Sequence, residues 1–96
     1  MTFPPSVDGN ERERVEQAMQ AFIFTEVECG TAFAALALSA YSDGKRQRNR
    51  HNARKAYDTA VYFWNKHPVF ELPAQYKLLV RLAKLRRMLV TLGEIF

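Results

Sequence analysis

The chain has 96 residues, of which 48% are hydrophobic and 25% charged, and its formal net charge is +4. This length allows one small domain, and the composition excludes intrinsic disorder, a collagen-like repeat and a low-complexity sequence. The single cysteine excludes a disulfide framework and a four-cysteine zinc site. We therefore expect a single globular domain over residues 1–96.

The sequence shows no sign of a targeting or membrane segment. Residues Met1 to Ser6 lack the basic start and apolar run of a secretory signal. The longest uncharged stretch, from Cys29 to Ser42, is shorter than the roughly twenty apolar residues of a membrane-spanning helix. We expect a cytoplasmic protein that does not associate with membranes.

The first predicted helix covers residues 10–41 and follows an extended arm, residues 1–7, whose two prolines exclude a helix. Asp8 or Asn10 can cap the start of this helix. Small residues around Gly30 allow a neighbouring helix to approach closely. Apolar residues at helical spacing predict the face that is buried in the core. They are Val15, Ala18, Met19, Phe22, Cys29, Ala32, Phe33, Leu36 and Ala40.

A turn at Ser42 to Gly44 separates this helix from a second one, predicted over residues 45–66 and ended by Pro68. The first two turns of the second helix contain no apolar residue, so we expect them to project beyond the core or to be covered by a partner. Its core positions come later and are Ala53, Ala56, Tyr57, Ala60, Val61 and Trp64.

A third helix is predicted over residues 74–94, with Pro73 in its first turn. Its leucines alternate in steps of four and three, the spacing of a helix that packs along one seam. The seam consists of Leu78, Leu82, Leu85, Leu89, Leu92 and Phe96.

Together these elements predict an all-α protein, an up-down-up antiparallel three-helix bundle. The first helix is longer than its partners need, and the third has apolar residues on more than one face. Both features predict a further apolar surface, and hence a dimer that forms a larger bundle. The apolar edge expected to take part in association consists of Leu79, Val90 and Ile95.

Charge is distributed unevenly along the chain. Residues 1–43 contain seven acids and two arginines, a net charge of −5, whereas residues 44–96 contain twelve bases and three acids, a net charge of +9. The acidic first helix can lie against the basic later helices, or it can support head-to-tail association. A third alternative leaves a basic face free for nucleic acid or another polyanion.

The densest basic segment runs from Lys45 to Lys55. In a helix, Arg46, Arg50 and Arg54 share one line at four-residue spacing and can follow a phosphate backbone. We take this segment as a candidate contact for a protein partner or a polyanion. Its candidate residues are Arg46, Arg48, Arg50, His51 and Arg54.

The sequence does not assign a catalytic centre, a metal site or a cofactor. Neither histidine follows a glutamate by three residues, as a di-iron bundle requires. The four glycines are scattered, so they form no phosphate-binding loop. Cys29 is predicted to be a small buried side chain rather than a ligand or a nucleophile.

Two short segments resemble known families. Arg46 followed by His51 resembles the Arg-x4–6-His motif of HEPN-type helical ribonucleases, which would imply that Arg46 binds phosphate and His51 handles protons at a dimer interface. The residue after the arginine is usually Asn, Asp or His in that family, and here it is Gln47. Gly30-x-x-Phe33 followed by Ala53-x-x-x-Tyr57-x-x-Ala60 resembles a single extended tetratricopeptide hairpin, which would imply two closely packed antiparallel helices.

We therefore expect a small non-catalytic helical bundle that acts by self-association or by protein–protein interaction, as a homodimer or with a protein partner. The alternative is RNA binding through residues 45–55, with Arg46 and His51 serving a HEPN-like ribonuclease. Ionic strength separates the two functions, because phosphate binding weakens steeply with salt whereas an apolar interface does not.

Overall fold

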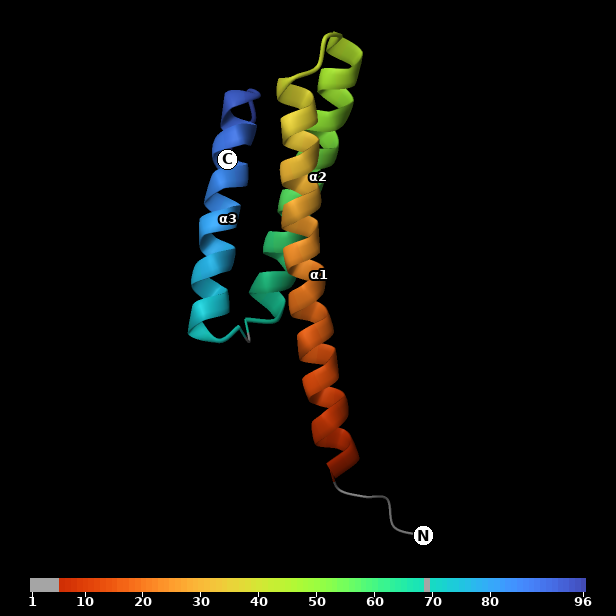
Figure 1. The fold of residues 1–96 in the computed structure, drawn as a ribbon, viewed down its shortest axis with the longest axis vertical. Helices are drawn as coiled ribbons and strands as arrows, with labels where there is room; N and C mark the ends of the chain where they lie inside the picture. The colour runs from red at the N-terminus through yellow and green to blue at the C-terminus, as the bar shows by residue number, and fades with distance from the viewer. Residues whose placement is uncertain (1–5, 69) are drawn as a thin grey trace.

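The computed structural model describes residues 6–68 and 70–96, with side chains from residue 11 onward except at residue 69. The described residues form three helices, α1 (Ser6–Leu38), α2 (Asp43–Lys66) and α3 (Leu72–Thr91). Figure 1 shows them as an antiparallel three-helix bundle in which α1 packs against both other helices. The molecule is 63 Å long because the first part of α1 projects past the ends of α2 and α3. The predicted fold is thus confirmed.

The helix boundaries differ slightly from those expected. Because α1 begins at Ser6, the last two residues of the predicted extended arm are helical, and Asp8 and Asn10 lie inside the helix instead of capping it. Residues 1–5 of that arm lie outside the described part of the chain. The turn between α1 and α2 lies slightly earlier than predicted: α1 ends at Leu38 and α2 begins at Asp43, so Asp43 and Gly44 are helical. Ser42 is the N-cap of α2, and its hydroxyl accepts a hydrogen bond of 3.3 Å from the Lys45 N–H.

Close packing at Gly30 joins α1 to both other helices. A Cβ atom at Gly30 would lie 2.8 Å from Leu85 Cδ2 of α3, 3.2 Å from Ala56 Cβ and 3.4 Å from the carbonyl oxygen of Ala53 in α2. Ala53 and Ala56 are themselves buried small residues. The backbones of α1 and α2 can therefore approach closely at this point, as the small residues predicted.

The third helix uses its predicted seam as its core face. Pro73 lies in the first turn of α3, and four leucines of the seam are buried. They are Leu78, Leu82, Leu85 and Leu89. Before α3, the connection is anchored by Phe70, which is buried and stacks against Phe24 of α1 with the ring centroids 5.5 Å apart.

The end of α3 corrects the predicted range of 74–94. Gly93 has a φ of +99°, and the N–H groups of Gly93 and Glu94 bond to the carbonyls of Val90 and Leu89. This is a Schellman motif, which ends the helix and turns the chain. Phe96 therefore does not extend the leucine seam on α3; its ring instead packs edge-on against Tyr57 of α2, with centroids 5.0 Å apart.

The core face of α1 is the main correction to the sequence-based prediction. The residues that α1 buries are Ile23, Val27, Gly30, Ala34 and Ala37. Only Met19 and Phe33 of the predicted stripe are among the partly buried residues packed on the core, while most of the stripe is exposed. The cause is that α1 is apolar on two sides, and α2 and α3 cover the side with Ile23 and Val27.

Candidate interaction surfaces

The exposed part of the predicted stripe forms a continuous line along α1, which we call the outer seam. It consists of Val15, Ala18, Phe22, Thr25, Cys29, Ala32 and Leu36, all of them exposed. The spacing alternates between three and four residues throughout, the pattern of a helix that packs along one partner helix. Val15 and Leu36 are 59% and 53% exposed, so the fold leaves their apolar surface in water.

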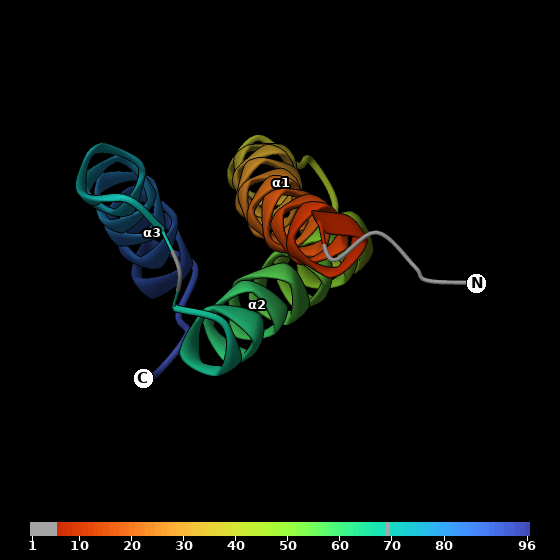
Figure 2. The ribbon, with the colours of Figure 1, turned by 90° about the horizontal axis from the view of Figure 1, so that it is seen from below.

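The outer seam lies on the side of α1 away from the core. In the end-on view of Figure 2, α2 lies below α1 and α3 to its left, which leaves the remaining side of α1 without a neighbouring helix. Phe22 is the member of the seam that touches α2, where its ring meets Phe63 edge-on at a centroid distance of 5.3 Å, yet it is still 39% exposed. No described element of this chain covers the seam.

Cys29 lies near the middle of the outer seam and is exposed, which corrects the prediction that it is buried. Glu28, beside it, forms an ion pair of 3.1 Å with Arg81 of α3. This is the one ion pair between α1 and another helix among the described residues. Charge pairing between the acidic first helix and basic α3 is thus limited to Glu28 and Arg81, because the other described acids of α1 form no such pair.

By length and composition alone, the segment Glu11–Leu38 of α1 is apolar enough to cross a membrane. A buried helix of a soluble protein and a signal sequence pass the same test. Within the fold, however, only 28% of its most apolar stretch is buried. The helix therefore carries more apolar surface than the rest of the described chain covers.

The apolar edge predicted on α3 is divided by the fold. Leu79 and Val90 lie on α3 and are 49% and 54% exposed. Val90 borders a shallow hollow that Arg86 and Arg87 also line. Ile95 is 87% exposed but lies beyond the end of α3, in the segment that turns towards α2. The three residues therefore do not form one helical face.

Three of the five basic candidates make contacts within the chain. Arg46 lies in the first turn of α2, where its guanidinium donates to the Asp43 carboxylate at 3.3 Å and to the Ala40 carbonyl at 3.2 Å. Arg50 donates to Glu94, which is mostly buried at 18% side-chain exposure.

Arg54 makes the largest set of these contacts. It donates to both carboxylate oxygens of Asp58 at 3.1 Å and to the Ile95 carbonyl at 2.9 Å, and it lies 3.4 Å from Glu94. Its guanidinium also lies over the Phe96 ring, 4.1 Å from the centroid. Arg50 and Arg54 therefore hold the segment after α3 against α2. The sequence suggested a line of arginines for phosphate, and two of its three members have this structural role.

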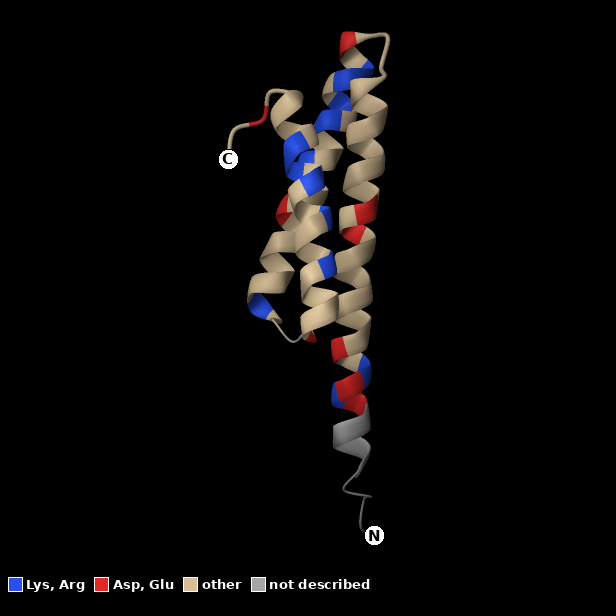
Figure 3. Ribbon diagram, turned by 60° about the vertical axis from the view of Figure 1, so that its left-hand side comes forward, with Lys and Arg blue, Asp and Glu red and all other residues tan. Residues whose placement is uncertain are grey.

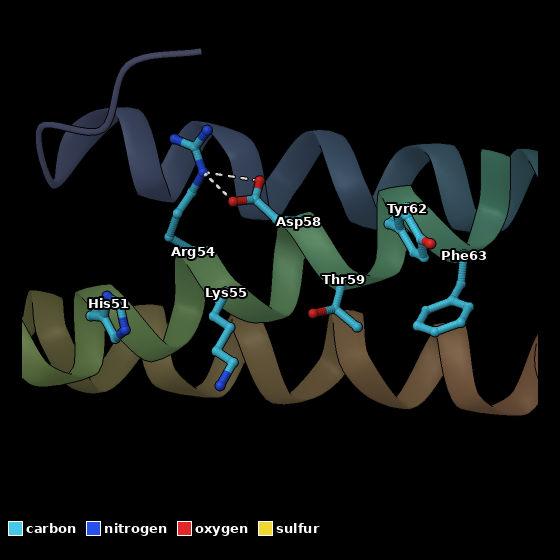
Figure 4. A pocket seen from close by; sticks show the side chains of 7 residues that line it. All are labelled: His51, Arg54, Lys55, Asp58, Thr59, Tyr62 and Phe63. Atoms are coloured by element: carbon cyan, nitrogen blue, oxygen red, sulfur yellow. Dashed lines mark hydrogen bonds and ion pairs between the residues drawn. The ribbon is translucent and has the colours of Figure 1, made fainter. Parts of the chain in front are cut away.

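The remaining Lys, Arg and His side chains of the basic segment lie on the surface. Lys45, Arg48, His51 and Lys55 have no ion-pair partner among the described residues. His51, Lys55 and Phe63 line an open groove of about 390 Å³ on α2, on the side that faces α1 in Figure 4. Arg54 and Asp58 point to the other side of α2, towards α3.

The structure does not unite Arg46 and His51 within one chain. Both lie on the continuous helix α2, where residues five positions apart leave the axis about 140° apart. Arg46 is also engaged by Asp43 and the Ala40 carbonyl. No cluster of three or more possible metal ligands occurs among the described residues.

A second groove, of about 350 Å³, lies where the outer seam meets the start of α2. It is lined by Leu36, the last residue of the seam, by Lys45 and Asn49 of α2, and by the turn between the two helices. Apolar and basic side chains thus adjoin at this end of the molecule. Figure 3 shows basic residues gathered there, while a group of acids lies towards the opposite, N-terminal end of α1.

Comparison of the chain with protein-family models, with curated proteins and with solved structures found no match. Neither the tetratricopeptide-like nor the HEPN-like resemblance therefore gains support beyond the residues that suggested it. The close approach of α1 and α2 at Gly30 is established by the structure itself.

Proposed function

We propose that the protein acts by association through the outer seam of α1. The partner that packs on this seam is a second copy of the chain. The observation that carries the proposal is the exposure of seven seam residues at unbroken heptad spacing. A helix with this spacing stabilises itself by inserting its side chains between those of a partner helix. Burial of this surface removes apolar side chains such as Val15 and Leu36 from water, which favours association.

The experiment is a measurement of molecular mass by sedimentation equilibrium across about 1–200 μM protein. Ala32→Glu places a charge within the outer seam, whereas Gln17→Glu adds the same charge to an exposed position of α1 outside the seam. The chain and Gln17→Glu should reach the mass of a dimer, and Ala32→Glu should remain a monomer with unchanged helicity. A monomeric mass for the unmodified chain at all concentrations would refute self-association.

A second candidate function, RNA binding, is supported by four exposed side chains of α2 that lack an ion-pair partner in the described chain: the cations Lys45, Arg48 and Lys55, and His51. Against it, Arg50 and Arg54 are engaged with Glu94 and Asp58. Anisotropy of labelled single-stranded RNA at about 50 and 200 mM salt separates the candidates, because contacts to phosphates weaken steeply with salt. Tight binding at the lower salt that is lost with Arg48→Ala would favour RNA.

A further inference from the structure

We infer that the second copy lies antiparallel to the first along the outer seam, so that the acidic start of its α1 lies beside the basic start of α2. This inference rests on the proposed function and assigns the orientation of the partner and a role for the basic surface. Two independent features carry it: the sizes of the seam residues and the distribution of charge along the molecule.

Large and small side chains alternate along the outer seam. One set of heptad positions holds the larger residues Val15, Phe22 and Leu36 together with Cys29, and the other holds the smaller residues Ala18, Thr25 and Ala32. In a parallel pair, each residue meets its own copy, so Phe22 meets Phe22 in one layer and Ala32 meets Ala32 in another. An antiparallel pair can place Val15 opposite Ala32 and Phe22 opposite Thr25, which fills these layers more evenly.

One register places the larger residues in this way without opposing like charges. Val15 then faces Ala32 of the second copy, Ala18 faces Cys29, and Phe22 faces Thr25, while the two-fold axis repeats each contact. In an antiparallel pair, Glu26 of each copy flanks the same side of the seam. A shift of one heptad towards the C-terminus would reduce the separation of these two glutamates along the helix axis from about 7.5 Å to about 3 Å. Like charges at such flanking positions destabilise the pair, so we favour the first register.

The ends of the molecule are oppositely charged. The first part of α1, residues 6–16, has four acids and two arginines, a net charge of −2, and residues 43–55 of α2 have six Lys or Arg and one Asp, a net charge of +5. Figure 3 shows basic residues gathered near the start of α2, and acidic residues interleaved with basic ones near the start of α1, at the other end of the long axis. Antiparallel association brings each acidic end to the basic end of the other copy, whereas parallel association brings like charges together.

The groove at the end of the outer seam is the site where the acidic start of the second copy's α1 would contact the basic start of α2. The start of the second copy's α1 projects past its own bundle, so it is available to extend along the seam to Leu36. There it reaches the groove between Leu36, Lys45 and Asn49. Glu11 lies four residues before Val15 on the same line of α1, so in the favoured register Glu11 of the second copy lies at the level of Leu36, within reach of Lys45.

A lipid surface is the other class of occupant for an apolar helix face. Helices that bind at a membrane interface carry Lys and Arg along their polar face. Between residues 15 and 38, α1 has Glu16, Glu26 and Glu28 and no Lys or Arg. The flanks of the seam therefore suit a second protein chain better than an anionic membrane.

The orientation can be measured with spin labels on a single engineered cysteine in a Cys29→Ser background. In the antiparallel register, residue 13 of the second copy lies level with residue 34. Because residue 13 also points away from the seam, labels on Glu13→Cys should be about 40 Å apart. A parallel pair has no offset along the axis and would give a shorter distance of about 25 Å, across two packed helices and two outward-pointing labels. Ala21→Cys lies close to the two-fold axis and should give a short distance in either orientation, which verifies that the labelled chain still pairs.

Charge reversal tests the contact at the groove. Glu11→Lys and Lys45→Glu should each weaken dimerisation by about three- to tenfold, because two exposed ion pairs are lost per dimer. The double variant should restore most of the affinity, and Glu13→Lys, on the side of α1 away from the seam, should have little effect. A short distance at residue 13, or a double variant no better than either single variant, would overturn the inference.

Two further outcomes separate the inference from the function on which it rests. A chain that is monomeric by mass refutes the proposed function itself. A monomer that sediments with vesicles of phosphatidylcholine and phosphatidylglycerol would identify the occupant as lipid and overturn the inference. A dimer of the expected mass with a short distance at residue 13 would leave self-association standing and refute only the antiparallel arrangement.

Discussion

The close approach of α1 and α2 can be tested by replacing a helical glycine with alanine in two separate variants. Gly30→Ala changes the point of close approach, and Gly44→Ala changes an open position. Replacing a helical glycine with alanine stabilises a helix by up to about 1 kcal/mol. At Gly44, the new Cβ would meet no atom within 4 Å, so Gly44→Ala should show this gain. At Gly30, the same Cβ would lie 2.8 Å from Leu85 Cδ2 and 3.2 Å from Ala56 Cβ.

The crowding at Gly30 should outweigh the gain in helix propensity. Leu85 is fully buried and Ala56 has no side-chain freedom, so relief requires the helices to separate. Overpacking of this kind costs about 1–3 kcal/mol, so Gly30→Ala should be less stable than Gly44→Ala by about that amount. For a domain of this size, the difference corresponds to roughly 4–20 °C in Tm.

Thermal unfolding followed by circular dichroism, at one protein concentration for all variants, measures both effects. Gly44→Ala controls for propensity because its surroundings are open. Gly30→Ala should unfold below the unmodified chain or close to it, and clearly below Gly44→Ala. Equal increases in Tm for the two variants would refute the close approach of α1 to α2 and α3 at Gly30.

The remaining predictions concern α3 and its end, and all are measured as changes in the free energy of unfolding by urea denaturation. Gly93→Ala should cost about 1–2 kcal/mol, because Gly93 has a φ of +99° that an L side chain adopts with strain; an unchanged stability would contradict the Schellman turn. Glu94→Gln should cost about 1 kcal/mol, and less in high salt, because its pairs with Arg50 and Arg54 are partly exposed; a loss that salt does not alter would indicate a different cause. Leu85→Ala should cost about 2–5 kcal/mol, whereas Leu79→Ala, whose side chain is half exposed, should cost much less; similar losses would place the core of α3 on the wrong face.

The second and third helices could be predicted well from the sequence because each has a clear start signal and a regular line of core residues. Ser42 caps α2, and Pro73 lies in the first turn of α3. The seam leucines Leu78, Leu82, Leu85 and Leu89 are buried as their spacing predicted. Local signals and burial agree in these segments, so a single pattern determines both the helix and its buried face.

The orientation of α1 could not be predicted in the same way. Two lines of apolar residues run along this helix, one through Ile23 and Val27 and one through Phe22 and Cys29. Periodicity detects both lines but does not decide which of them α2 and α3 cover. The close approach at Gly30 decides it, because only the line that contains Gly30 permits the contact with Ala53 and Ala56.

The roles of the basic residues depended on contacts between distant parts of the chain. Arg50 and Arg54 meet Glu94 because the turn at Gly93 directs the following residues towards α2. A glycine near the end of a leucine-rich helix was the available signal for such a turn. The position of its acidic neighbour beside two arginines of α2 required the three-dimensional fold.

The reactivity of Cys29 tests most directly whether a second copy covers the outer seam. The chain has one cysteine, and its thiol is exposed near the middle of the seam in the isolated chain. The rate of its alkylation by a maleimide should fall as the protein concentration rises from about 1 to 200 μM, and it should stay high at all concentrations in Ala32→Glu. A rate that is independent of concentration in both chains would contradict the central claim that the seam is an interface between two copies.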